Sequence, residues 1–162
     1  MPVIWTPADN SVLEIANRYI LLHHRHLLDT DIGFSFRSET QESGGRLVIG
    51  QASKVSEKFQ ALMNVTDRVD FQIWVAKDWW DDADDAQREA LIDHELCHIG
   101  PGGKLRSHDI EEFHAIVDRH GLWDRDLRQF GRIAAAKQAA LPGIDAQLEH
   151  TGSVKAVQFI PN

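Results

Sequence analysis

The stretch ALIDHELCHIGPGG, residues 90–103, holds two histidines four positions apart, a glutamate directly after the first, and a glycine-rich run behind them. Residues i and i+4 lie one above the other on the same face of an α-helix, so His94 and His98 would present both imidazoles to one point in space. Glu95 lies about 100° further round the helix. We therefore expect a helix that offers two nitrogen ligands to one metal ion and a carboxylate to a water molecule beside it.

The sequence around this motif predicts where its helix begins and ends. A helix is predicted over residues 81–99, with several aspartates in its first turn, at the positive end of the helix dipole. Gly100 is the expected C-terminal residue, and Pro101 prevents further helix. The alternating segment DFQIWVA, residues 70–76, predicts a strand before it. Cys97 lies on another face of the helix and is interpreted as a small, buried apolar residue.

The remaining segments predict an α+β fold, in which helices flank a small mixed or antiparallel sheet packed on the motif helix. The chain of 162 residues fits one domain over residues 1–162, with a core at about 8–130 and a C-terminal helix and tail at 124–162. Helical periodicity and strand alternation place the other elements as follows: helices at 6–28, 53–63, 108–121 and 126–141, and strands at 31–36, 46–52 and in the tail at 153–162.

Composition excludes several classes of function. Arginine and lysine number 17 against 25 acidic residues, and the net charge of −8 makes nucleic-acid binding an unexpected role. No apolar run reaches the roughly 18 residues of a membrane span, so no membrane association is expected. One cysteine permits no internal disulfide, and the N-terminal stretch MPVIWTPADN has no secretory signal pattern. These features favour a cytoplasmic location.

A catalytic zinc site needs a third protein ligand and leaves its fourth position to water. The next histidine is His108, and the loop at 100–103 would turn the chain so that this side chain faces the ion. Glu111 and Glu112 are alternatives, as is His114 one turn further along. The other histidine cluster, HHRH at residues 23–26, has poor ligand spacing and is interpreted as the solvated end of the first helix.

The motif and its surroundings resemble the phage metallopeptidase family over roughly residues 8–130. The segment that begins at His108 is similar to the third-ligand element of Spartan-type (SprT-like) proteases. It differs from theirs in having Asp109 where those proteases have glycine, and in a shorter gap before His108. The stretches that carry the family resemblance are ALIDHELCHI, the glycine-rich gap, HDIEEFHAIVDRHGLW at 108–123 and DFQIWVAKDWW at 70–80.

The resemblance implies a compact zincin-like fold and a peptidase activity. His94, His98 and His108 would bind Zn²⁺, and a zinc-activated water would hydrolyse a peptide bond with Glu95 as general base. The substrate would be a protein or peptide, met in the host cytoplasm if the protein is phage-encoded. The strand at 70–76 would lie along the cleft edge and bind an extended substrate by strand addition.

Two other functions are compatible with the same residues. One is a metal-binding protein that interacts with or inhibits a partner while its peptidase site is unused. The presence of Glu95 favours an enzyme, because a purely structural zinc ion needs no carboxylate there. The other is a Spartan-type, DNA-associated protease, which the net charge of −8 disfavours.

Overall fold

A four-stranded mixed sheet organises the first unit of the chain in the computed structural model, which describes residues 2–123 and 125–140. The chain divides after Ser107 into two units, which we describe separately. The central strands β2 and β6 are parallel, while the outer strands β1 and β5 each run antiparallel to their neighbour. The strand order is β1 (Trp5–Pro7), β2 (Ile32–Arg37), β6 (Phe71–Ala76) and β5 (Gly50–Lys54).

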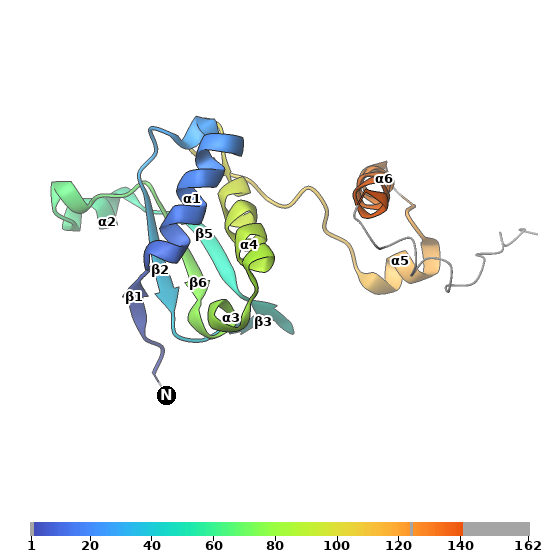
Figure 1. Cartoon of the computed structure of the whole chain (residues 1–162), viewed down its shortest axis with the longest axis horizontal. Helices are drawn as coiled ribbons and strands as arrows, with labels where there is room; N and C mark the ends of the chain where they lie inside the picture. The colour runs from blue at the N-terminus through green and yellow to red at the C-terminus, as the bar shows by residue number, and fades with distance from the viewer. Residues whose placement is uncertain (1, 124, 141–162) are drawn as a thin grey trace, which may run out of the picture. The chain divides into compact units, whose positions relative to one another are not determined.

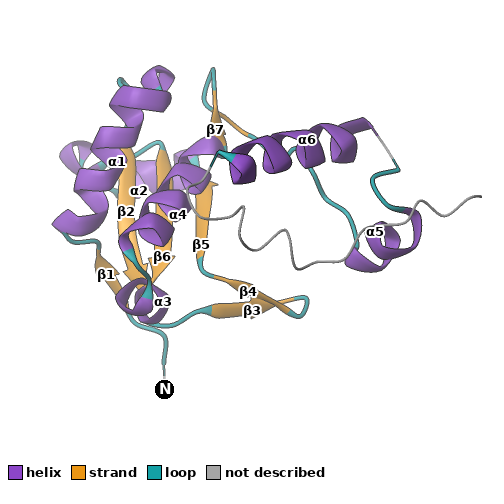
Figure 2. Cartoon of the chain, turned by 45° about the vertical axis from the view of Figure 1, so that its right-hand side comes forward, coloured by secondary structure: helices purple, strands orange, loops and turns teal. Residues whose placement is uncertain are grey.

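Two helices, α1 (Asn10–His23) and α4 (Asp85–Cys97), lie side by side across one face of this sheet (Figures 1 and 2). The core fills the space between the helices and the sheet. Burying each aliphatic side chain there contributes roughly 1.5–3 kcal/mol. Its largest fully buried side chains are Val12, Phe71, Ile73, Val75, Ile92, Leu96 and Ile99.

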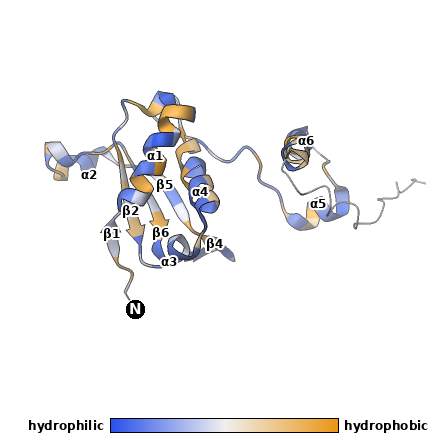
Figure 3. Ribbon diagram, viewed as in Figure 1, coloured by the Kyte–Doolittle hydropathy of each residue, from blue (hydrophilic) through white to orange (hydrophobic). Residues whose placement is uncertain are grey.

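The pleat of β6 explains why the sheet has one apolar face and one mixed face. Successive side chains of a strand point to opposite faces, so Phe71, Ile73 and Val75 reach the core while Gln72 and Trp74 point away from it. Gln72 donates a hydrogen bond of 2.8 Å to the Ser35 hydroxyl on β2. Figure 3 shows hydrophobic colour along much of β6 and hydrophilic colour along much of α4.

The predicted helix over residues 81–99 is two helices in the structure. A short helix, α3 (Lys77–Asp82), precedes α4, and only Asp84 acts as the α4 N-cap. Its carboxylate accepts a hydrogen bond of 2.8 Å from the Gln87 backbone amide, and the Gln87 side chain accepts one of 3.0 Å from the Asp84 amide. This reciprocal capping box fixes the start of α4.

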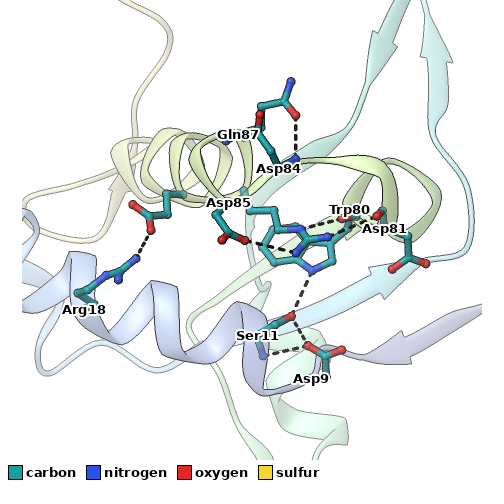
Figure 4. Close-up of polar contacts among 10 residues, drawn as sticks. Asp9, Ser11, Arg18, Trp80, Asp81, Asp84, Asp85 and Gln87 are labelled. Carbon is teal, nitrogen blue, oxygen red and sulfur yellow. Dashed lines mark hydrogen bonds and ion pairs between the residues drawn. The ribbon is translucent and has the colours of Figure 1, made fainter. Parts of the chain in front are cut away.

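A polar network joins the N-terminal ends of α1 and α4 through α3 (Figure 4). Asp9 caps α1, and its carboxylate accepts hydrogen bonds from the Ser11 amide and hydroxyl. The same Ser11 hydroxyl accepts a hydrogen bond of 3.1 Å from the indole nitrogen of buried Trp80. The Trp80 carbonyl in turn accepts a hydrogen bond of 2.9 Å from the Arg88 side chain on α4. The network therefore sets the position of α4 relative to α1 at the ends of the two helices.

Smaller elements complete the described chain, and several predictions change there. Residues 108–121 form a helix only from position 114, and Phe113, the residue before it, is 73% exposed. The helix predicted at 53–63 covers six residues. The remaining elements are η1 (Arg25–Leu27), β3 (Gln41–Ser43), β4 (Arg46–Val48), α2 (Glu57–Leu62), η2 (Val65–Asp67), β7 (Ile99–Gly100), β8 (Lys104–Leu105), α5 (His114–His120) and α6 (Arg125–Ala139).

The α+β class and the mixed sheet packed on the motif helix are confirmed. The extent of a single domain over residues 1–162 stays a prediction. The strand predicted at 153–162 lies outside the described residues. None of the helices that the structure describes is both long and apolar enough to cross a lipid bilayer.

Candidate metal centre

The two motif histidines converge at the C-terminal end of α4. The helix ends at Cys97, and His98 is its C-cap with φ −67° and ψ −19°, so the i, i+4 relation to His94 is preserved. The two Nε2 atoms are 3.3 Å apart. Two nitrogens each 2.0–2.1 Å from one tetrahedral zinc ion would be about 3.3–3.4 Å apart. The spacing of this pair therefore fits zinc.

A backbone carbonyl orients the His98 ring. Its Nδ1 lies 2.8 Å from the carbonyl oxygen of Arg106, an arrangement that places a hydrogen on Nδ1 and the lone pair on Nε2. A hairpin of β7 and β8 brings Arg106 next to His98, and the Arg106 backbone amide donates a hydrogen bond of 2.7 Å to the His98 carbonyl. The C-terminal prediction for α4 is thus corrected, because Gly100 pairs with Lys104 in this hairpin instead of ending the helix.

His108 completes a cluster of three histidines. One ring nitrogen from each of His94, His98 and His108 lies within 4.8 Å of the other two, so this cluster could hold a metal ion. The turn before β8 allows the chain to return toward the end of α4. In this turn Gly102 and Gly103 adopt φ angles of 76° and 68°, which residues with a Cβ rarely adopt.

The alternative third ligands lie elsewhere in the described chain. The Glu112 carboxylate accepts hydrogen bonds of 2.8 Å from the Phe113 amide and 3.1 Å from the Trp123 indole. Within the described residues, no group of metal donors includes Glu111, Glu112 or His114. The geometry accordingly favours His108 over these three.

Glu95 is buried beside the histidine pair, with its side chain turned toward β5. The residue is 3% exposed, and its Oε2 has no hydrogen-bond partner within the described chain. Burial raises the pKa of the Glu95 carboxyl to about 7, against the lowering influence of the His98 charge and of the Ala52 backbone amide. A buried carboxylate oxygen without a partner in the described protein is open to a hydrogen bond from a substrate or water.

The edge strand beside the motif helix is β5. This corrects the prediction that residues 70–76 lie along the edge of the cleft. The strand β6 lies between β2 and β5, so it has no free edge, whereas β5 is the last strand of the sheet. A Cβ added to Gly50 of β5 would lie 3.0 Å from Oε1 of Glu95. Glycine inside a strand often marks a close approach of this kind, and it is the signal in the sequence that could have identified β5.

The second histidine cluster differs from its prediction at one residue, His24. His24 is buried, with its Nε2 2.6 Å from Oδ1 of Asp93, and His26 Nε2 lies 2.8 Å from the Ile99 carbonyl oxygen. His23, Arg25 and His26 are exposed, as predicted for a solvated helix end, and only His24 departs from that prediction. Cys97, expected to be buried, is exposed. Its sulfur lies within 4.8 Å of donor atoms of His24 and Asp93.

Comparison with known families gives one result. A family model described as "Putative phage metallopeptidase" matches residues 4–131, which span the sheet, both large helices and the three histidines. No curated protein and no solved structure matches the chain.

Proposed function

We propose, from the premise that the chain belongs to the phage metallopeptidase family, that the protein is a zinc-dependent peptidase acting on protein or peptide substrates. The family suggests a metalloprotease, and the three-histidine cluster could bind the metal. The observation that carries the proposal is the convergence of the His94 and His98 nitrogens, 3.3 Å apart, with His108 beside them and buried Glu95 next along the helix.

In this proposal His94, His98 and His108 hold the ion as neutral imidazoles. A bound zinc ion supplies Lewis acidity, which polarises a carbonyl oxygen and lowers the pKa of water. The Arg106 carbonyl keeps His98 in the tautomer whose Nε2 is a ligand. All three donors are nitrogens, which suit zinc and the other first-row transition metals, whereas calcium and magnesium prefer oxygen ligands.

Glu95 moves the proton. It takes one from the attacking water and delivers it to the nitrogen that leaves when the peptide bond breaks. A pKa near neutrality suits both halves of this transfer, because the group must accept and release a proton in one cycle. The Ala52 amide, which donates a hydrogen bond to this carboxylate, holds it at the edge of β5.

The substrate would lie extended along the free edge of β5. In the antiparallel pair with β6, alternate residues of β5 turn their amides and carbonyls away from β6, and Ala52 is one of them because its amide reaches Glu95. A peptide added as a further strand would therefore run past the carboxylate that moves the proton. We place this reaction in the cytoplasm of an infected cell, on a host or phage protein.

The test compares the wild type with Glu95→Gln on a proteome-derived peptide library, read by mass spectrometry, with zinc content measured on the same samples. Glu95→Gln should keep its zinc and lose at least about 10²-fold in cleavage rate, which is the contribution of a positioned general base. Glu89→Gln, which alters a partly buried glutamate of the same helix that contacts Arg18 and Tyr19 on α1, is the matched control and should cleave as the wild type does.

Two results would contradict the proposal. The first is a wild type that binds zinc and cleaves no peptide, which would favour a protein that interacts with or inhibits a partner. The second is a Glu95→Gln variant that keeps both its zinc and its cleavage rate.

A further inference from the structure

A second set of metal donors lies on the α4 face next to the His94–His98 pair. Asp93 and Cys97 are also four positions apart, so they share a face of the helix. His24, the C-cap residue of α1, meets them from the neighbouring helix. One donor atom from each residue, a ring nitrogen, a carboxylate oxygen and a sulfur, lies within 4.8 Å of the other two.

We propose that His24, Asp93 and Cys97 form a second binding site, for a divalent cation of the zinc class. Imidazole, carboxylate and thiolate are the donor types that zinc accepts in proteins. The thiolate disfavours magnesium and calcium, which take oxygen ligands. Three protein ligands leave one position of a tetrahedral ion for water or an incoming ligand. This site uses none of the histidines of the first cluster and is independent of the proposed peptidase activity.

The His24 ring is held in place for this role before any ion binds. Its side chain is 8% exposed, and its backbone amide donates to the carbonyls of Tyr19 and Ile20, which fixes the residue at the end of α1. The neighbouring His26 ring, 6.1 Å away between centroids, is bound to the Ile99 carbonyl. A ligand whose orientation is already fixed loses little freedom when it binds an ion.

The composition of the cluster argues for an ion in addition to a hydrogen bond. The contact of 2.6 Å between His24 and Asp93 explains two of the three residues. The Cys97 sulfur, within 4.8 Å of donor atoms of both partners, supplies the third donor that a tetrahedral cation can use. The Asp93 side chain is 39% exposed and Cys97 is exposed, so an ion can reach the site from solvent.

An ion at this site would join two helices that meet the sheet side by side. His24 belongs to α1, while Asp93 and Cys97 alternate along α4 with His94 and His98. Occupancy of the second site would therefore hold α4, and with it the first cluster, against α1. We assign the second site this stabilising role, because it offers no buried carboxylate comparable to Glu95.

Cobalt is the probe that distinguishes the two sites, because a cobalt–thiolate bond gives a charge-transfer band in the near ultraviolet and cobalt–imidazole bonds do not. Metal-free protein, kept reduced with a phosphine, would be titrated with Co²⁺ in three forms: wild type, Cys97→Ser, and the double variant His94→Ala/His98→Ala. The wild type should bind about two cobalt ions per chain and show the band. Cys97→Ser should bind about one ion without the band, and the double variant about one ion with it.

Further variants and outcomes keep the result decisive. Asp93→Asn, which retains a hydrogen-bond acceptor for His24, should weaken the thiolate-linked cobalt at least about tenfold. The absence of the band from the wild type and the double variant would overturn the proposal, as would a second ion that Cys97→Ser retains. If the first cluster, His94, His98 and His108, binds no metal, the Cys97→Ser protein will bind no cobalt. That result is distinct from the ones that would overturn the second site.

Discussion

Two neighbouring faces of α4 carry donor pairs at the same spacing, but they are completed in different ways. His94 and His98 are joined by His108, which follows the helix after one hairpin. Asp93 and Cys97 are joined by His24, which lies at the end of another helix. The comparison shows that helix periodicity determines each pair, while the third partner depends on how the chain returns to the helix.

The two faces also differ in the chemistry that they support. The first combines imidazoles with a buried carboxylate, Glu95, whose Oε2 has no partner within the described protein. The second combines a buried imidazole with a partly exposed carboxylate and an exposed thiol. Hydrolysis needs a proton acceptor beside the metal, so only the first face suits catalysis. The following predictions test this division, from the largest expected effect to the smallest.

The largest difference should appear in activity. His98→Ala removes a proposed metal ligand and should lower the rate of peptide-library cleavage by about 10³-fold or more, since in the proposed mechanism several kcal/mol of transition-state stabilisation depend on the metal. Cys97→Ser, one position away on the other face, should change the rate by less than about threefold at saturating zinc. Comparable losses in the two variants would mean that both faces serve one reaction.

A second prediction concerns Glu95 in the metal-free protein, where burial raises its pKa to about 7 from 4.5. The folded state then holds the proton more tightly than the unfolded state, so this stability is present below pH 4.5 and is lost as pH rises through about 7. Glu95→Gln does not titrate. It should therefore be more stable than the wild type at pH 8, by up to about 3 kcal/mol, and nearly equal at pH 4.5.

Urea unfolding in the presence of a chelator measures this difference at each pH. A gap between the two proteins that stays constant from pH 4.5 to pH 8 would show that the Glu95 carboxyl is not the buried, titrating group described above.

A third prediction addresses the second face in the absence of metal. Asp93→Ala leaves the buried ring of His24 without its carboxylate acceptor at 2.6 Å, and should lower the free energy of unfolding by about 1–3 kcal/mol. Glu14→Ala, on the exposed side of α1, is the control and should change stability by less than about 0.5 kcal/mol. Equal, small effects in both variants would indicate that the histidine–aspartate contact adds nothing to the packing of α1 on α4.

The elements that the sequence predicted are those with a strong local pattern. The motif helix, the strands β2 and β6, and α1 all follow from periodicity within one segment. The convergence of His94 and His98 was predictable for the same reason, since residues four positions apart share a helix face. Their roles and that of Glu95 stay predictions. His108 required only a short return of the chain, which the glycines at 102 and 103 indicated.

The features that sequence reasoning missed depend on contacts between distant segments. Nothing in HHRH shows that His24 will be buried against Asp93, because that contact joins residues on two helices. The assignment of the cleft edge to residues 70–76 failed because strand order is a property of the whole sheet. The helix predicted from position 108 was wrong over residues 108–113, where local periodicity is not accompanied by burial of Phe113 within the described chain.

The smallest expected effect concerns the contact between β5 and the first face. A Cβ at position 50 would lie 3.0 Å from Oε1 of Glu95 and 3.3 Å from both a Leu91 methyl group and the Trp74 carbonyl. The carboxylate is the nearest of the three and the far end of a flexible side chain, so Gly50→Ala should displace it and slow cleavage about tenfold, which is about 1.4 kcal/mol, with the fold retained. Gly33→Ala crowds Gln72 in the same sheet and should leave the rate per folded molecule unchanged. Equal rates in both variants would separate the edge strand from catalysis and leave the metal ligands alone to define the first face.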